Sequence, residues 1–148
     1  MTPIALRLLD SEQDFQSAFP IMKELRPHLP DAASFIEQVG RQAEQGYRLL
    51  AAWQGDQVAG LAGYRLQENL IYGKFLYVDD LITTAHARSD GVGAALIGAV
   101  REDARRQGCA HLVLDPGLGN ALGPRFYFRQ GLLAAGLHFR QPLSGDTP

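Results

Sequence analysis

The stretch Arg88-Ser89-Asp90-Gly91-Val92-Gly93 combines residue types that can bind a phosphate group. Two glycines separated by one residue let the main chain approach a ligand closely, because no Cβ stands in the way. If a helix begins here, its first N–H groups lack partners inside the helix and lie at the positive end of its dipole. Arg88 adds a fixed positive charge. The same turn could instead only let a helix pack on a sheet, as many short glycine motifs do.

The residues on either side predict that this turn joins a strand to a helix. Residues 75–83 are rich in β-branched and aromatic side chains, which favours a strand. After the turn, apolar residues recur at helical spacing up to Gly108, which marks the end of an amphipathic helix: Val92, Leu96, Ala99, Val100 and Ala104.

Two better-known phosphate motifs do not fit the turn. A P-loop needs Lys and then Ser or Thr after its last glycine, where this chain has Ala94 and Ala95. A dinucleotide fingerprint needs a third small residue at the position of Leu96. What remains resembles the acyl-CoA signature of the GNAT superfamily of N-acetyltransferases, in which Arg or Gln is followed three residues later by Gly-x-Gly or Gly-x-Ala.

A second stretch resembles the last helix of the same family. Asn120 is followed seven residues later by Tyr127 and four residues beyond that by Gly131. Pro124 departs from the family pattern, and because proline is tolerated only in a first helical turn, we expect the helix to begin near it, after Asn120. Two further segments resemble a subgroup of small bacterial members, namely Val-Asp-Asp-Leu at 78–81 and His138-Phe139.

The whole chain predicts the element order β-α-α-β-β-β-α-β-α-β, with an optional last strand. Ser11 or Asp10 and then Asp31 can cap the first two helices, and Pro20 should kink or break the first. Strands are expected at residues 4–9, 47–53, 57–66, 75–83, 110–114 and 132–139, with a hairpin at Gly55-Asp56 and a short helix at 124–130. The expected class is α/β (α+β), a mixed and mostly antiparallel sheet of about six or seven strands with helices on both faces. This order resembles the GNAT fold, which implies a sheet splayed at its centre.

Composition narrows the class of protein. The chain has 148 residues, 46% of them hydrophobic, which predicts one domain at 1–143 and a flexible tail at 144–148. A net charge of -2 gives no sign of nucleic-acid binding, and no apolar run is long enough for a membrane span, so a cytoplasmic protein is expected. Cys109 is the only cysteine, and the four histidines lack ligand spacing, so neither a disulfide nor a metal site is expected.

The resemblance implies acetyl-CoA as the donor and an amine of a small molecule or protein as the acceptor. The cofactor's pyrophosphate would meet the main chain from Arg88 to Gly93, and Asn120 would also contact the cofactor. Its pantetheine arm would pair with main-chain groups of Leu81, Ile82 and Thr83, like an added strand. A backbone N–H near Leu81 would polarise the thioester carbonyl. Tyr127 resembles the residue that protonates the departing thiolate, although a half-buried aromatic with a bonded hydroxyl would have the same spacing.

Asp79 and Asp80 are the candidates for the base. As neighbours on a strand they should point to opposite faces, so only one should face the acceptor. That one would act as the base, directly or through a water, or bind the acceptor ammonium; the family resemblance favours Asp79, and a purely structural pair is the alternative. Candidate substrate-binding residues are Tyr64, Arg65, Tyr72, Tyr77 and His28. With Arg26, His28 lies in a loop between helices and could favour an anionic acceptor.

Two other functions remain open at this stage. The chain could be an acyl-CoA-binding or sensing module without catalysis, or a structural domain whose glycine turn binds no nucleotide. A homodimer is also expected, because the last strands of a small sheet leave edges that need cover.

Overall fold

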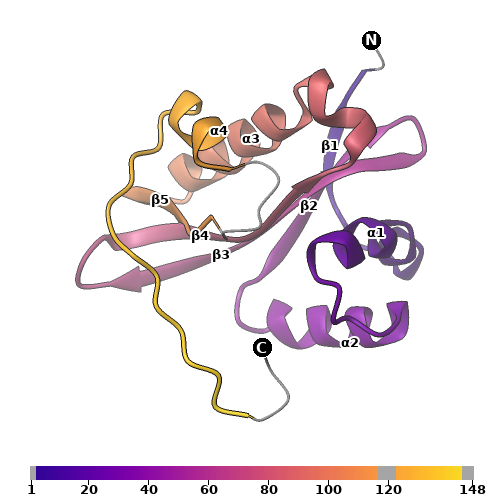
Figure 1. Cartoon of the computed structure of the whole chain (residues 1–148), viewed down its shortest axis with the longest axis horizontal. Helices are drawn as coiled ribbons and strands as arrows, with labels where there is room; N and C mark the ends of the chain where they lie inside the picture. Colours follow the sequence, from indigo (N-terminus) through magenta and orange to yellow (C-terminus); the bar gives the residue numbers. More distant parts are fainter. Residues whose placement is uncertain (1–2, 117–122, 145–148) are drawn as a thin grey trace. The chain divides into compact units, whose positions relative to one another are not determined.

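The computed structural model describes residues 3–116 and 123–144, with the main chain alone at Arg88 and Ser89. It divides into two compact units, Met1–Leu114 and Asp115–Pro148. The first unit holds the strands β1 (Ala5–Leu8), β2 (Arg48–Gln54), β3 (Gln57–Asn69), β4 (Gly73–Thr83) and β5 (His111–Leu114), and the helices α1 (Glu12–Leu25), α2 (Ala32–Ala43) and α3 (Val92–Arg106) (Figure 1). A 3-10 turn, η1 (Ala85–Asp90), precedes α3, and the second unit holds α4 (Gly123–Arg129). Among these described helices, none has both the length and the apolar character needed to cross a membrane.

The five strands form one mixed sheet in the order β1-β2-β3-β4-β5. The first four pair antiparallel in sequence order, and the hairpin between β2 and β3 turns at Gly55-Asp56 as predicted. β5 pairs parallel with β4, because the chain returns through α3 before it re-enters the sheet. The predicted mixed sheet with one crossover is therefore confirmed.

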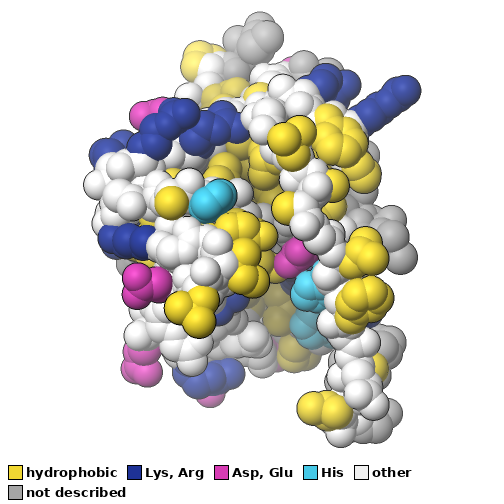
Figure 2. All heavy atoms as spheres, turned by 90° about the vertical axis from the view of Figure 1, so that its left-hand side faces the viewer, with side chains coloured by type: hydrophobic (Ala, Val, Ile, Leu, Met, Phe, Trp, Pro, Cys, Tyr) yellow, Lys and Arg dark blue, Asp and Glu magenta, His cyan; other side chains and the backbone are white. Residues whose placement is uncertain are grey.

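The predicted last strand at residues 132–139 is wrong, and the described sheet has five strands instead of six or seven. This segment contains Ala134, Ala135 and Gly136 in a row, which have low strand propensity. The described part of the second unit contains no other strand that could pair with it. In this segment Leu133, Leu137 and Phe139 are exposed, as are Leu70 and Ile71 between β3 and β4. Hydrophobic side chains are visible across the face in Figure 2.

Helices cover both faces of the sheet in the first unit. α1 and α2 lie on one side and α3 on the other (Figure 1). Gly60 on β3 shows how closely α3 approaches, since a Cβ there would lie 2.8 Å from Val92 Cγ1 and 3.0 Å from Leu96 Cδ1. The opposite face packs buried side chains of α1, α2 and the strands into a core that includes Met22, Phe35, Leu49, Leu61 and Ile82.

The first two helices begin where the sequence predicts. Ser11 Oγ accepts a hydrogen bond from Asp14 N (3.1 Å), and Asp31 Oδ1 accepts one from Ser34 N (2.8 Å). α1 does not break at Pro20 and continues to Leu25. Pro20 lacks the N–H that would donate one helical hydrogen bond. The helix nevertheless continues, with Ala18 and Met22 buried on either side of the proline.

Candidate active site

β4 has two pairing partners over its first half and one over its second. β5 pairs with β4 from Phe75 to Val78 and ends at Leu114, opposite Val78. β4 continues to Thr83 and stays paired with β3 to its end, where Thr83 lies opposite Gly60. Within the first unit, the second half of β4 therefore has one edge without a partner strand.

The pairing register identifies the main-chain groups on this open edge. Thr84 N donates to Ala59 O at 2.9 Å, which makes these residues a bonded pair. Bonded and non-bonded pairs alternate in an antiparallel ladder, so Ile82 bonds to Leu61 and the N–H groups of Leu81 and Thr83 point to the open edge. Of the three residues predicted to pair with the pantetheine arm, Leu81 and Thr83 thus have main-chain groups available, whereas Ile82 faces β3. The Thr83 hydroxyl is also buried and has no hydrogen-bond partner among the described residues.

The turn predicted to bind phosphate follows β4 directly in the chain. η1 ends at Asp90, Gly91 adopts φ 77° and ψ 18°, and α3 begins at Val92. A Cβ on Gly91 would meet nothing within 4 Å, so the left-handed backbone, not lack of space, requires glycine there. Asp90 Oδ2 accepts from Gln54 Nε2 (3.1 Å), which ties the turn to β2. The first described helical bond of α3 runs from Ala95 N to Gly91 O (3.0 Å), so the N–H groups of its first turn precede the helical ladder.

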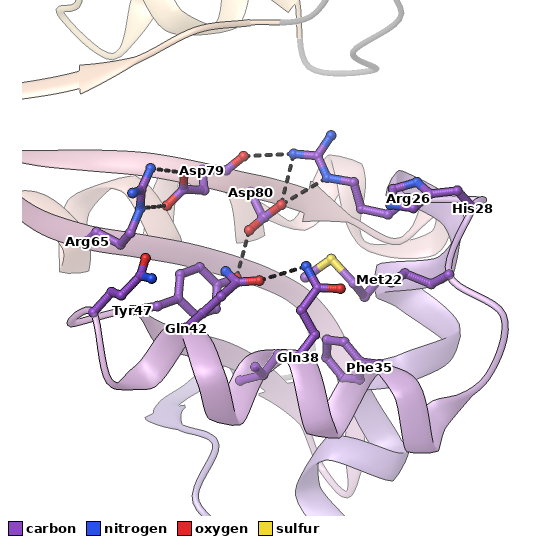
Figure 3. A pocket seen from close by; sticks show the side chains of 13 residues that line it. Met22, Arg26, His28, Phe35, Gln38, Gln42, Tyr47, Arg65, Asp79 and Asp80 are labelled. Carbon is purple, nitrogen blue, oxygen red and sulfur yellow. Dashed lines mark hydrogen bonds and ion pairs between the residues drawn. The ribbon is translucent and has the colours of Figure 1, made fainter. Parts of the chain in front are cut away.

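Asp79 and Asp80 lie on a β-bulge. Tyr64 pairs with Val78 and the preceding residue, Gly63, pairs with Asp80, so Asp79 is an extra residue on β4. The prediction that the two aspartates point to opposite faces is wrong, because both line one pocket (Figure 3). The extra residue interrupts the alternation of side chains that the prediction assumed.

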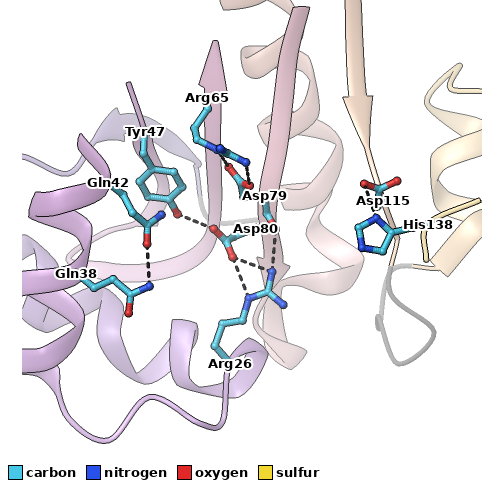
Figure 4. A network of polar contacts seen from close by, with 9 residues as sticks. All are labelled: Arg26, Gln38, Gln42, Tyr47, Arg65, Asp79, Asp80, Asp115 and His138. Carbon is cyan, nitrogen blue, oxygen red and sulfur yellow. Dashed lines mark hydrogen bonds and ion pairs between the residues drawn. The ribbon is translucent and has the colours of Figure 1, made fainter. Parts of the chain in front are cut away.

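Both carboxylates are held by basic or phenolic partners from distant parts of the first unit (Figure 4). Arg65 donates two hydrogen bonds to Asp79, each of 2.7 Å. Arg26 Nε donates to Asp80 Oδ1 (2.9 Å), and Arg26 also donates to the Asp79 carbonyl oxygen (2.8 Å). Tyr47 OH donates to Asp80 Oδ2 at 2.7 Å. Each carboxylate oxygen of the pair therefore accepts at least one strong hydrogen bond.

Tyr47 is a buried donor that does not titrate near neutral pH. Burial raises its pKa well above the ordinary value for a phenol, and the negative charge of Asp80 raises it further. Gly63 makes room for this contact, because a Cβ there would overlap the Tyr47 hydroxyl and lie 2.8 Å from Asp80 Oδ2. A bulge, a glycine and a buried tyrosine thus fix Asp80 together.

The pocket beside the aspartates has a volume of about 370 Å³ and lies between β4 and the α1–α2 segment. Besides the aspartates and the arginines Arg26 and Arg65, it is lined by apolar and polar side chains, namely Met22, Leu29, Phe35, Val39, Gln38, Gln42, Gln45, Tyr47 and His28. Gln38 Nε2 donates to Gln42 Oε1 (3.0 Å). Two of the predicted substrate-binding residues, His28 and Arg65, therefore lie at this pocket.

The three tyrosines predicted to bind substrate do not line this pocket. Tyr64 points to α3, where its hydroxyl donates to Asp103 Oδ2 (2.9 Å), and burial followed by this bond raises its pKa to about 12. Tyr72 packs its ring against Phe75 and His111, with centroids 5.4 and 5.0 Å apart. The ring of Tyr77 lies 5.7 Å from the Arg65 guanidinium. Tyr64 and Arg65 are neighbours on β3, so the alternation of a strand separates them.

Sequence reasoning missed Tyr47 and the glutamines of α2. Gln38 and Gln42 are four residues apart and share a helical face with Phe35 and Val39. That spacing was a usable signal for the glutamines. No such signal marks Tyr47 in the sequence, because it precedes a strand of mostly apolar residues and its partner Asp80 is 33 positions away.

The second unit carries the remaining predicted residues. Tyr127 is the buried residue of α4, whose observed start at Gly123 agrees with the predicted start near Pro124. Asn120 lies outside the described residues. His138 Nδ1 lies 3.4 Å from Asp115 Oδ2 (Figure 4). Throughout residues 3–116 and 123–144, no group of three or more His, Cys, Asp or Glu side chains could hold a metal ion.

Comparison with known proteins identifies the family of the chain. The model of the Acetyltransferase (GNAT) family matches residues 8–132, so the chain belongs to the GNAT family of acetyltransferases. Since members of this family use acetyl-CoA, the chain is an acetyl-CoA-dependent N-acetyltransferase.

Individual relatives align with almost the whole length of this chain. The uncharacterized N-acetyltransferase YhdJ of Bacillus subtilis is 29% identical over 142 residues, which cover 95% of this chain and 99% of YhdJ. A Trypanosoma brucei acetyltransferase superposes with a TM-score of 0.81 at 22% identity, over 95% of this chain and all of the other. The aminoglycoside N-acetyltransferase AAC(6')-Iy, solved with CoA, gives 0.82 at 16% identity over 96% of each chain. At such identities the two structures establish the fold alone.

Proposed function

We propose that the chain transfers an acetyl group directly from acetyl-CoA, held along the open edge of β4, to an amine held in the pocket of Asp79 and Asp80. One observation carries this proposal. The aspartates that line the pocket are followed at once by Leu81, the first residue whose N–H points to the open edge. The two substrates would therefore meet at neighbouring residues of a single strand.

The residues present fit acetyl-CoA. The amide groups of a pantetheine arm match the main-chain groups of Leu81 and Thr83, as in the addition of a strand. The first turn of α3 supplies N–H groups and the positive end of a 15-residue helix, which suit a pyrophosphate, and the sequence places Arg88 just before it. The bound cofactor supplies the acyl thioester, and the protein supplies orientation and donors.

The Leu81 N–H is the proposed donor to the thioester carbonyl oxygen, where negative charge develops during transfer. Removal of a donor of this kind typically costs about 100- to 1000-fold in rate. Because this donor belongs to the main chain of a paired strand, its position is fixed by the bonds that β4 makes to β3.

Asp79 and Asp80 are better suited to orient the acceptor than to remove its proton. Their oxygens already accept bonds from Arg65, Arg26 and Tyr47, which fix the positions of both carboxylates. Each carboxylate oxygen has a second lone pair, so either residue can still accept a hydrogen bond from the acceptor amine. In this proposal a water carries the amine proton away.

Tyr127 remains the proposed acid for the departing thiolate. Tyr127→Phe should lower kcat by about 100-fold or more, the range expected for general acid catalysis, while the acetyl-CoA Kd stays unchanged. Tyr72→Phe is a matched control, because Tyr72 packs against Phe75 and His111 away from the pocket. Equal kcat values for the two variants would contradict the role of Tyr127.

The function is tested by thiol release from acetyl-CoA in the presence of a panel of amines, with the acetylated product identified by mass. We expect release that depends on an amine. Binding of acetyl-CoA by calorimetry, together with no amine-dependent release, would instead favour the acyl-CoA-sensing alternative.

A further inference from the structure

We infer that the acceptor is a mono-amine whose other polar groups are uncharged amides or hydroxyls, and that polyamines are poor acceptors. The inference rests on the proposed function, because it takes the pocket of Asp79 and Asp80 as the acceptor site. It is drawn from the charges, the amide groups and the apolar surface of that pocket.

The described lining of the pocket offers no carboxylate whose charge is not already balanced by an arginine. Asp79 and Asp80 are the only acidic residues among the described residues that line it, and each is paired with an arginine. The Arg65–Asp79 pair is bidentate, the geometry in which such pairs are strongest. A second ammonium group would lose its hydration on entry without gaining an opposite charge, and it would lie close to two guanidinium groups.

The wall opposite the aspartates is made of amides. Gln38, Gln42 and Gln45 line the pocket from α2 and its C-terminal end, and Figure 3 shows Gln38 and Gln42 pointing from α2 toward β4. The bond from Gln38 Nε2 to Gln42 Oε1 occupies one donor and one acceptor. The carbonyl oxygen of Gln38 and the amide nitrogen of Gln42 have no described partner, so together they offer the pair of groups that an amide or a hydroxyl needs.

The remaining wall is apolar. Met22, Leu29 and Phe35 are buried core residues that also border the pocket. They suit the carbon skeleton of the acceptor, whereas a flexible polycation would place charge against them. Apolar, amide and neutralised ionic surfaces together favour a polar mono-amine.

This acceptor class differs from that of some proteins with the same fold. AAC(6')-Iy is an aminoglycoside N-acetyltransferase, yet at 16% identity its likeness to this chain concerns the fold alone. The arginine partners of Asp79 and Asp80 are an observation on this chain and argue against an aminoglycoside acceptor.

The test compares two acceptors of equal length, β-alaninamide and diaminopropane, in the thiol-release assay. They differ in whether the second group is an amide or an ammonium. We expect kcat/KM to be at least about tenfold higher for β-alaninamide, since an unpaired desolvated charge is costly. Spermidine should behave like diaminopropane. An equal or higher kcat/KM for the two polyamines would overturn the inference.

A variant of Arg65 tests whether the arginine partner of Asp79 causes this preference. Arg65→Gln removes the partner of Asp79, so the ratio of kcat/KM values should move toward diaminopropane by about tenfold. Arg65→Lys keeps the charge and should leave the preference for β-alaninamide. Arg41→Gln is the matched control, because it removes an arginine of α2 that pairs with Glu37 and does not line the pocket. An unchanged ratio in a folded Arg65→Gln protein would contradict the explanation.

If Arg65→Gln does not fold, Arg26→Gln provides the same comparison at Asp80. Calorimetric binding of β-alaninamide and diaminopropane to each variant gives a readout that does not depend on turnover, and the same shift in ratio is expected. Failure of the proposed function looks different, since no amine would then release thiol. Efficient release with polyamines alone would overturn only the acceptor class.

Discussion

The two halves of β4 belong to one continuous strand but have very different surroundings. From Phe75 to Val78 the strand is paired on both edges and buries Phe75, Leu76 and Val78. From Asp79 to Thr83 it begins with a bulge, carries two acids and has one open edge in the first unit. The first half is paired on both sides within the sheet, and in our proposal the second half presents main-chain and carboxylate groups to ligands. The proposed site lies where β5 no longer covers β4, because main-chain groups of β4 are free to bind a ligand there.

Proline substitutions should separate the two halves most sharply. Leu76→Pro should prevent folding, because both edges are paired there and proline removes a ladder hydrogen bond from a buried strand. In Thr83→Pro the lost N–H is one that points to the open edge, so the protein should fold, with acetyl-CoA affinity at least about tenfold weaker. Urea unfolding and calorimetry measure the two effects. A folded Thr83→Pro protein with unchanged acetyl-CoA affinity would contradict the proposed difference between the two halves of β4.

A smaller effect is expected at the bulge. Gly63→Ala places a methyl group against the Tyr47 hydroxyl and Asp80, which should destabilise the protein by about 1 to 3 kcal/mol and lower turnover. Gly40→Ala in α2 is the control, because no atom lies within 4 Å of its Cβ, and it should stabilise the protein by about 0.5 to 1 kcal/mol. Thermal unfolding of both variants is the measurement. Two stabilised variants would mean that Gly63 does not hold Asp80 in place.

The smallest effect concerns an ion pair outside β4. The hydrogen bond from Arg7 to Asp14 (2.7 Å) lowers the pKa of Asp14 from 3.8 to about 2. Because the folded-state pKa is the lower one, this contribution to stability is present above pH 3.8 and is lost as the pH falls through about 2. Arg7→Gln should therefore lose less stability than the parent over this acid range. Urea unfolding at several pH values tests this, and parallel curves for the two proteins would contradict it.

Local patterns in the sequence were enough to predict most of the fold. The caps at Ser11 and Asp31, the hairpin at Gly55-Asp56 and the helix after Gly91 each depend on residues within a few positions of one another. The strand at residues 132–139 was the failure, because a strand also needs a partner, and the segment's own residues do not specify one.

The site was less predictable because it depends on distant partners. The bulge at Asp79 arises from how β3 and β4 pair, which no short motif of β4 encodes. Arg26 lies 54 positions from Asp80, and Tyr47 lies 33 positions from it. The residue types of the site could be found from the sequence, whereas the partners that neutralise the aspartates could not.

Hydrogen exchange of the β4 amides, with and without saturating acetyl-CoA, tests the central claim most directly. The Ile82 N–H bonds to β3 and should exchange slowly in both states, which makes it an internal control. The account predicts that acetyl-CoA slows exchange at Leu81 and Thr83 by about tenfold or more, as new hydrogen bonds cover the open edge. Unchanged exchange at both residues, in protein shown to be saturated, would contradict it.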